Sequence, residues 1–453
     1  MAFIRRIKKK SGIYLAKVES YRKEGKVKQR VIKYLGKEID GEIVRRVKSS
    51  DIGVEYVKRS LDIMAIDKVA DELGIKEIRD KNILALVYSQ LMENRTINKM
   101  GEWLRFSEIP EVLGIGEVNS IGLYNSLSYF DEEEFKVIER RLKEFFMSIE
   151  GSNRSIVIDV SDTYFEGDSL EIESRRGKDG KVKKLRQFCI ATTFKEGFPL
   201  LYSSYQGNLS NINIMKDMGM KLGEEGCEMV VMDRGMSSIE NIKMLKSLGI
   251  KIICGLRKNN KLIDIIKGIR REEIYRRENR LELKSGSVYI KGIKDLGGEI
   301  IIVYNPQLEI YRNEQAFEKG IDIGEKLYGY SLIYHDTDLV IEEVVKRYYE
   351  KDIIERAFKQ MKGVIGIRPV RVWLREHIEN HFRICYLAYA ILSYINYKLE
   401  GTGISGKESL EILKQGYKVR LVDKSSKDGW DLWVPLEPKG KEILKKLGVV
   451  YKT

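Results

Sequence analysis

The chain has 453 residues, of which 43% are hydrophobic and 33% are charged, and it carries a net charge of +13. Such a length allows about two to four domains with a substantial core, and the composition is that of an ordinary globular protein. No apolar run approaches the roughly 20 residues of a membrane-spanning helix, and the N-terminal residues lack the apolar stretch of a signal peptide, so we expect a cytoplasmic protein without a membrane segment.

The first fifty residues carry most of the positive charge. They contain 16 Lys and Arg against 5 Asp and Glu, an excess of +11, whereas the rest of the chain is close to neutral at +2. Residues 2–37 predict three short strands, separated by turn signals at 11–12 and 24–25. We therefore expect a basic β segment over residues 1–48, too small to be stable without docking and suited to contact with a polyanion.

Residues 49–150 predict a helical domain. Apolar residues recur at helical spacing at Leu84, Val87 and Leu91, and Asp131 precedes three glutamates, as at the start of a helix. Several short helices beside a basic segment are typical of a DNA-binding domain. A purely structural helical domain has the same pattern.

Residues 151–260 predict the first part of an α/β core. The expected order is three antiparallel strands, a helix over 211–222, a strand, a helix that begins after Ser237 with Glu240 in a capping box, and a fifth strand. This is the order of an RNase H-like sheet. Asp159 and Asp233 lie at or near the ends of apolar strands, where functional groups of α/β sheets gather.

The remaining residues complete a predicted α/β fold. Residues 261–338 contain mainly strands and one helix over 308–317, and we interpret them as a β-rich insertion. Helices are predicted over 342–362 and 377–399, and we assign residues 339–400 to the core again. Residues 401–453 form a C-terminal region whose pattern predicts no role. The predicted fold is thus an RNase H-like core, a mixed sheet with helices, that carries a β-rich insertion and follows a basic β segment and a helical domain.

The predicted helix over 342–362 has one polar stripe. On a helical wheel Tyr348, Lys351, Glu355 and Lys362 fall within roughly 60°. The stripe contains a single acid, flanked by two lysines and a tyrosine. An ordinary solvated face with charge pairs has the same appearance.

The spacing of these four residues resembles the signature of a known enzyme family. Two, three and six residues separate Tyr348, Lys351, Glu355 and Lys362, as in the YREK-signature insertion-sequence transposases, the insertion sequence four-like branch of the DDE family. Lys351 stands where the family has arginine, and lysine lacks the planar fork that grips a phosphate through two hydrogen bonds. Asp159 and Asp233 resemble the family's two aspartates. The step at 207–208 and the stretch 367–382 are also similar, so the resemblance covers nearly the whole chain.

This resemblance implies a cut-and-paste DNA transposase in which Asp159, Asp233 and Glu355 hold two Mg²⁺ ions, with Mn²⁺ as a substitute. Carboxylates supply the hard oxygen ligands that Mg²⁺ prefers, and two such ions stabilise the entering and leaving oxygens of phosphodiester chemistry. Lys351 and Lys362 would hold phosphates, and Tyr348 would contact the DNA backbone. The implied partners are terminal inverted repeats and target DNA, bound by a DNA-bridged homodimer at the nucleoid, with hairpin ends as a further expectation.

Weaker candidates and other functions remain open. Asp162 is a rival to Asp159, and His377 and His381 have a spacing that suits either a metal or a structural role. The four cysteines have no spacing of a disulfide framework or a zinc site. Two alternatives to an active transposase are a catalytically inactive DNA-binding descendant and a stand-alone RNase H-like nuclease. A basic cluster is either a DNA-facing loop or a solvated one; it contains Lys178, Lys181, Lys183, Lys184 and Arg186.

Overall fold

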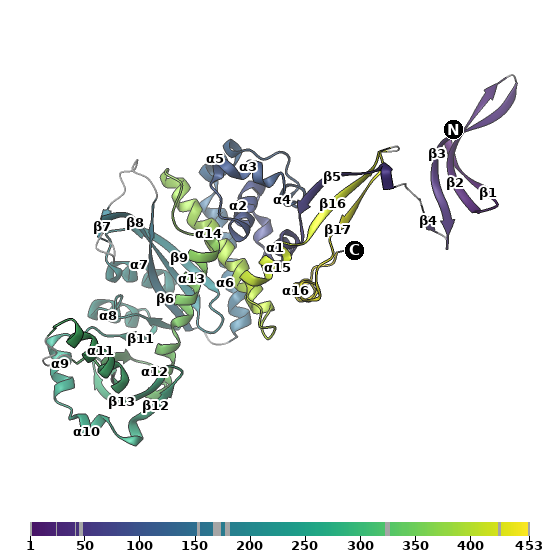
Figure 1. Cartoon of the computed structure of the whole chain (residues 1–453). Coiled ribbons are helices and arrows are strands. Elements are labelled where there is room, and N and C mark those ends of the chain that lie inside the picture. Colours follow the sequence, from purple (N-terminus) through teal and green to yellow (C-terminus); the bar gives the residue numbers. More distant parts are fainter. Residues whose placement is uncertain are drawn as a thin grey trace. The chain divides into compact units, whose positions relative to one another are not determined.

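A computed structural model describes residues 2–23, 25–40, 42–44, 49–151, 155–165, 174–176, 182–321, 327–424 and 427–451, with backbone alone for 174–176 and 182–184. These residues form two compact units (Figure 1). One lies within Met1–Lys58 and Tyr417–Pro435, and the other within Arg59–Gly416 and Leu436–Tyr451. No helix in the described ranges is both long and apolar enough to cross a membrane.

The first unit contains two sheets. One is a four-stranded antiparallel sheet of β1 (Ala2–Lys9), β2 (Gly12–Lys23), β3 (Lys26–Ile39) and β4 (Glu42–Val44), in that order. This confirms the strands predicted over 2–37. The other has the order β17 (Gly429–Trp433), β16 (Tyr417–Asp423) and β5 (Ile52–Arg59). A 3₁₀ turn, Ser49–Asp51, comes directly before β5 in the chain. Part of the C-terminal region therefore pairs with the N-terminal segment, which no sequence pattern indicated.

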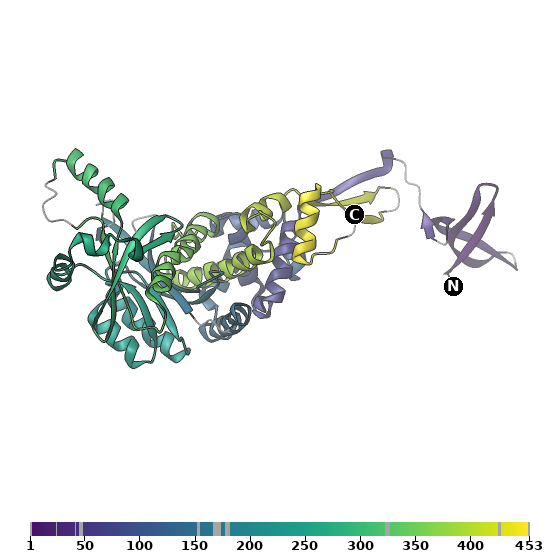
Figure 2. The ribbon, with the colours of Figure 1, turned by 90° about the horizontal axis from the view of Figure 1, so that it is seen from below.

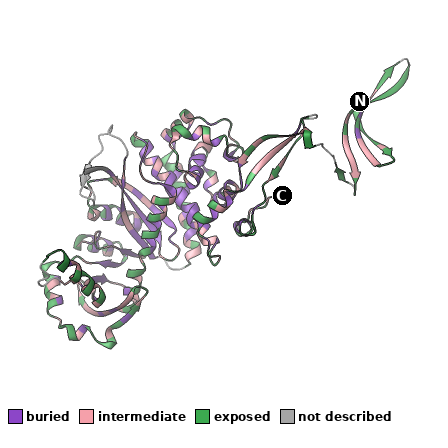
Figure 3. Cartoon of the chain, in the orientation of Figure 1, coloured by how far each residue is buried: buried purple, intermediate pink, exposed green. Residues whose placement is uncertain are grey.

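The four-stranded sheet buries little apolar surface. Ala16 and Val18 are buried, whereas Phe3, Val31 and Tyr34 are exposed. Exposed and intermediate residues make up most of this sheet (Figure 3). A small sheet with so few buried side chains has little hydrophobic stabilisation of its own. That it is stable only when docked stays a prediction.

The expectation of a helical domain from residue 49 onward was wrong at its start, where Ile52–Arg59 forms strand β5 and pairs with β16. From Leu61 onward the structure confirms the predicted helices, which belong to the second unit. They are α1 (Leu61–Glu72), a 3₁₀ turn (Ile75–Glu77), α2 (Lys81–Met92), α3 (Ile97–Leu104), α4 (Ile109–Leu113), α5 (Ser120–Tyr129) and α6 (Glu132–Glu150). Asp131 caps α6, because its side chain accepts a hydrogen bond from the backbone N–H of Glu133.

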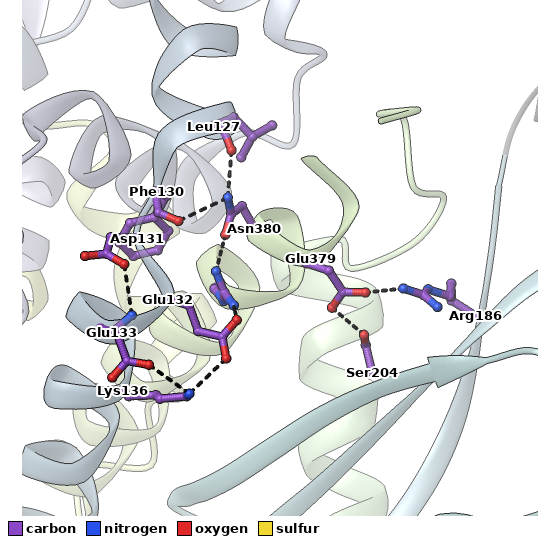
Figure 4. A network of polar contacts seen from close by, with 11 residues as sticks. Leu127, Phe130, Asp131, Glu132, Glu133, Lys136, Arg186, Ser204, Glu379 and Asn380 are labelled. Carbon is purple, nitrogen blue, oxygen red and sulfur yellow. Dashed lines mark hydrogen bonds and ion pairs between the residues drawn. The ribbon is translucent and has the colours of Figure 1, made fainter. Parts of the chain in front are cut away.

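Helix α14 (Arg375–Lys398) joins the helical domain to the sheet. It packs against α1, α2 and α5 and against a strand of the core, so most of its side chains are buried (Figure 3). The Asn380 amide donates to the carbonyls of Leu127 and Phe130 (Figure 4). Two further helices, α15 (Gly406–Leu413) and α16 (Pro438–Leu447), pack beside α1 and α14 (Figure 2).

A ten-stranded mixed sheet forms the core. Its strands are β6 (Ser155–Tyr164), β7 (Ser174–Arg176), β8 (Val182–Thr193), β9 (Pro199–Gln206), β10 (Met229–Met232), β11 (Lys251–Gly255), β12 (Arg280–Leu283), β13 (Gly286–Asp295), β14 (Gly298–Tyr304) and β15 (Tyr330–His335). The order is β12-β13-β14-β15-β11-β10-β6-β8-β7, and β9 also pairs with β8. Strand β10 is parallel to β6 and β11, and β6, β8 and β9 are antiparallel, as predicted.

The β-rich insertion continues the core sheet instead of forming a sheet of its own. Strand β15 pairs antiparallel with both β11 and β14, which adds β12 to β15 to the edge of the core. The insertion also carries α9 (Asn260–Lys267), α10 (Arg271–Ile274), a 3₁₀ turn (Arg277–Asn279) and α11 (Pro306–Glu318).

Helices cover the core sheet, with α7 and α8 on one side and α12 and α13 on the other (Figure 1). Their bounds are α7 (Asn211–Glu224), α8 (Ile239–Ser247), α12 (Ile341–Glu350) and α13 (Asp352–Gln360). Helix α12 packs on β10 and β11, and α13 packs on β6. The single helix expected over 342–362 was wrong: it is interrupted at Lys351 and ends in a π-helix, Met361–Ile365. The N-cap of α8 is Ser238 and not Ser237, because the Ser238 side chain accepts from the Asn241 N–H.

Candidate active site

Parallel pairing of β6 and β10 brings two aspartates side by side. The register joins Val157 to Val231 and Ile158 to Met232, so Asp159 and Asp233 are the next residues on adjacent strands. Strand β10 ends at Met232, whereas β6 continues to Tyr164. Asp159 therefore lies inside its strand, beside the point at which the neighbouring strand β10 ends.

Two residues of the predicted polar stripe contact Asp233. The Tyr348 hydroxyl donates to Asp233 Oδ1 over 3.2 Å, and the Lys351 ammonium donates to the same oxygen over 3.1 Å. The ammonium also lies 5.1 Å from the centroid of the Tyr348 ring. Tyr348 is in the last turn of α12, and Lys351 is the residue between α12 and α13. The helix is thus interrupted at Lys351, the residue whose ammonium contacts Asp233.

The other two stripe residues lie further along the same segment. Glu355 is in the first turn of α13 and is exposed, and its negative charge acts on Asp159. Lys362 lies in the π-helix, with its ammonium 5.4 Å from the centroid of the Phe358 ring.

The two aspartates have opposite electrostatic environments. Burial raises the pKa of Asp159 to about 6; the charges of Asp233 and Glu355 add to this, while the Val160 N–H and Lys351 oppose it. Burial also acts to raise the pKa of Asp233, but the Lys351 ammonium and the hydrogen bonds to that carboxylate hold this pKa below its ordinary value. The anionic form is therefore destabilised at Asp159 and stabilised at Asp233.

The carboxylates fit a divalent metal ion by their chemistry. Asp159, Asp233 and Glu355 offer hard oxygen ligands, and the raised pKa of Asp159 marks negative charge that a cation would stabilise. Within the described part of the chain, no three His, Cys, Asp or Glu side chains are close enough together to hold one ion. The donor set is thus suitable by its chemistry.

Gly255, the last residue of β11, is a site residue that the sequence analysis missed. A Cβ at this position would lie 2.3 Å from the Tyr348 hydroxyl and 3.2 Å from Cβ of Arg234. The Ser237 hydroxyl donates to the Gly255 carbonyl over 2.6 Å. A glycine inside an apolar strand signals close approach of another group, and this signal was present in the sequence.

The rival acid and the histidine pair have other surroundings. Side chains alternate along a strand, so Asp162 is on the opposite face of β6 from Asp159. His377 bonds to the Ser128 hydroxyl over 2.7 Å. His381 is half-buried beside the Cys385 sulfur, at 3.6 Å, and desolvation lowers its pKa to about 4. Both histidines therefore have structural contacts.

A cavity of about 1180 Å³ lies away from these acids and is lined by residues of α6, β9 and α14. Arg186 forms an ion pair there with Glu379, which also accepts from the Ser204 hydroxyl (Figure 4). Arg186 is thus paired within the protein. The lysines of the same predicted basic cluster, Lys178, Lys181, Lys183 and Lys184, lie outside the described residues or have undescribed side chains.

Two family models match the sequence. The transposase DDE domain matches residues 151–391, more than half of the chain, and the N-terminal domain of IS1634 family transposases matches residues 4–56. The chain belongs to the DDE transposases. It is a metal-dependent enzyme that cleaves DNA and transfers strands, as the sequence predicted.

The matched domain of this transposase spans the described site. It includes Asp159 of β6, Asp233 directly after β10, and Tyr348 of α12. A search of curated proteins finds no match. Among solved structures, the cryo-EM structure of the piggyBac transposase synaptic complex with hairpin DNA is similar, with 11% sequence identity and a TM-score of 0.43 over 78% of this chain and 77% of that chain.

Proposed function

We propose that the transposase carries out cut-and-paste transposition with Asp159, Asp233 and Glu355 as its metal-binding acids. The adjacency of Asp159 and Asp233 on parallel strands carries this proposal. Tyr348 and Lys351 support it, because both donate to Asp233 from the segment that also contains Glu355.

The proposal includes an RNase H-like core and membership in the YREK-signature branch. Three antiparallel strands followed by parallel β10 and β11 support the fold. The spacing of Tyr348, Lys351, Glu355 and Lys362 supports the branch, with lysine in place of arginine at Lys351.

The three carboxylates would hold Mg²⁺, with Mn²⁺ as a substitute and two ions as the expected number. When bound, such ions activate the attacking oxygen and stabilise the leaving one. Lys351 and Tyr348 orient the Asp233 carboxylate through their hydrogen bonds to its Oδ1. Lys351 and Lys362 also bring positive charge to the DNA phosphates.

The proposed partners are the terminal inverted repeats of the element and the target DNA. The +11 excess of the first fifty residues supports DNA contact by the basic β segment, residues 1–48, and the helical domain, residues 49–150, would add to it. A DNA-bridged homodimer at the nucleoid completes the proposal. The core, residues 151–260 and 339–400, would perform the chemistry around the insertion, residues 261–338.

The test is Mg²⁺-dependent cleavage of duplex DNA that carries the ends of the element, with wild type compared with Glu355→Gln. Glu350→Gln is the matched control, because Glu350 is also exposed and lies just before Lys351. We expect cleavage by the wild type and the control, and DNA binding without cleavage by Glu355→Gln.

Each other outcome selects another assignment. Equal cleavage by Glu355→Gln and wild type would show that Glu355 is not the third acid. Binding without any cleavage by the wild type favours the inactive DNA-binding descendant. Cleavage without strand transfer favours the stand-alone nuclease.

A further inference from the structure

Four cations gather beside Asp233, beyond the carboxyl ends of β10 and β11. Arg234 follows Asp233 directly, Arg257 and Lys258 follow β11, and Arg312 is on α11 of the insertion. All four are exposed. We call Arg234, Arg257, Lys258 and Arg312 the basic ledge.

Backbone contacts hold the two strand-end loops of the basic ledge together. The Arg257 guanidinium donates to the Gly235 carbonyl over 3.3 Å, and the Ser237 hydroxyl bonds to the carbonyl at the end of β11. These contacts place the start of the basic ledge next to the Tyr348 and Asp233 pair, because a Cβ on Gly255 would meet both Tyr348 and Arg234.

The insertion completes the basic ledge. The Lys258 ammonium donates to the Leu327 carbonyl. The segment after Leu327 lies against the start of α11, where a Cβ on Gly329 would be 2.7 Å from Cβ of Glu309. Arg312 is one helical turn beyond Glu309 and therefore on the same face of α11.

The basic ledge differs from other cations of the insertion in its pairing. Arg270, Arg276 and Arg280 each form an ion pair with a nearby glutamate. Within the described ranges, the basic ledge has carbonyl contacts at Arg257 and Lys258 and no ion pair to a carboxylate. Desolvation, Arg312 and Arg234 together lower the pKa of Lys258, as expected for unbalanced like charges.

We propose that the basic ledge binds phosphates of the DNA strand that extends from the cleavage site toward the insertion. The inference rests on the proposed function, since it assumes that DNA is bound at the three acids. Guanidinium groups match phosphate geometry through paired hydrogen bonds, and an exposed group of unpaired cations attracts a polyanion. The insertion thereby acts as part of the DNA-binding surface and not only as an extension of the sheet.

The test measures how DNA affinity of the full-length protein depends on salt, in EDTA, so that no cleavage occurs. The probe is a fluorescent duplex that carries the ends of the element. The ledge variant combines Arg234→Gln, Lys258→Gln and Arg312→Gln. The control combines Arg270→Gln, Arg276→Gln and Arg280→Gln, which removes the same charge from paired positions. Thermal unfolding of both variants checks that they are folded.

Loss of three phosphate contacts lowers the steepness of log affinity against log salt by about 2.7. The affinity ratio of wild type to ledge variant then shrinks about 40-fold between 50 and 200 mM salt. The control is expected to keep the wild-type slope. An unchanged slope for the ledge variant, or an equal fall for both variants, overturns the inference.

Wild-type cleavage in Mg²⁺, measured in parallel, distinguishes a failure of the basic ledge from a failure of the proposed function. If wild type cuts the ends but the ledge variant keeps the wild-type slope, the basic ledge is wrong and the proposed function stands. If wild type does not cut, the proposed function fails, and the slopes still decide whether the basic ledge binds DNA.

Discussion

Substitution of Gly255 by alanine tests whether Tyr348 must reach Asp233. The added Cβ would lie 2.3 Å from the Tyr348 hydroxyl, so the hydroxyl has to move by about 1 Å, a displacement that can cost on the order of 100-fold in rate at an active site. This movement breaks its 3.2 Å hydrogen bond to Asp233. A hydrogen bond to a charged group contributes about 1.5–3 kcal/mol, which corresponds to a cleavage rate about 10- to 150-fold lower.

Single-turnover cleavage and DNA affinity are the measurements. Gly255→Ala should lower the cleavage rate and leave DNA affinity nearly unchanged, because no DNA-binding group is removed. Gly116→Ala is the control, since a Cβ there meets nothing within 4 Å. Global unfolding is not the expected cause, because alanine also lowers the entropy of the unfolded chain, which offsets part of the clash by about 0.4–1 kcal/mol.

A double-mutant cycle identifies the route of the effect. Tyr348→Phe removes the hydroxyl that donates to Asp233 and also the atom closest to the new Cβ. Gly255→Ala combined with Tyr348→Phe should therefore be little slower than Tyr348→Phe alone. Wild-type cleavage by Gly255→Ala, or fully additive losses in the cycle, would refute the view that Gly255 acts by positioning Tyr348.

Substitutions at Lys351, Glu139 and Arg59 test the charged groups of the structure. Lys351→Arg should keep cleavage within about threefold of wild type, whereas Lys351→Ala should lose about 10-fold or more with its charged hydrogen bond; single-turnover rates distinguish them. Burial raises the pKa of Glu139 to about 7, so the folded state binds this proton more tightly than the unfolded state, and stability falls as pH rises from about 4.5 to 7. Urea unfolding should accordingly show that the stability advantage of Glu139→Gln over wild type grows by about 2 kcal/mol between pH 5.5 and 8, while Glu144→Gln, an exposed change on the same helix, shows no such growth. Arg59→Met should destabilise the fold by about 3–5 kcal/mol in urea unfolding, because it leaves the buried Asp62 carboxylate without its main partner; Arg59→Met with Asp62→Leu should recover most of that loss, and failure to recover would show that the pair is not the cause.

Local patterns predicted most elements of the core. A run of apolar residues marks β6, and the capping acid Asp131 marks the start of α6, because these signals depend on neighbouring residues in the chain. The same locality explains the errors. Nothing near Ser237 distinguishes a cap from a residue that bonds to a distant strand, and only its contact with Gly255 decides this.

In the candidate site, too, some features follow from the sequence and others from the tertiary structure. The sequence by itself determined the residue types: two strand aspartates, a spaced tyrosine, lysine and glutamate, and hence the class of chemistry. Only the tertiary structure decided that Ile158 pairs with Met232, so that Asp159 and Asp233 meet, and that the helix breaks where Lys351 bonds to Asp233. It also joined β16 to β5 and β15 to β11. Pairing between strands far apart in the chain depends on which backbone hydrogen bonds and buried faces can be satisfied together, and a local pattern of side chains contains no record of that choice.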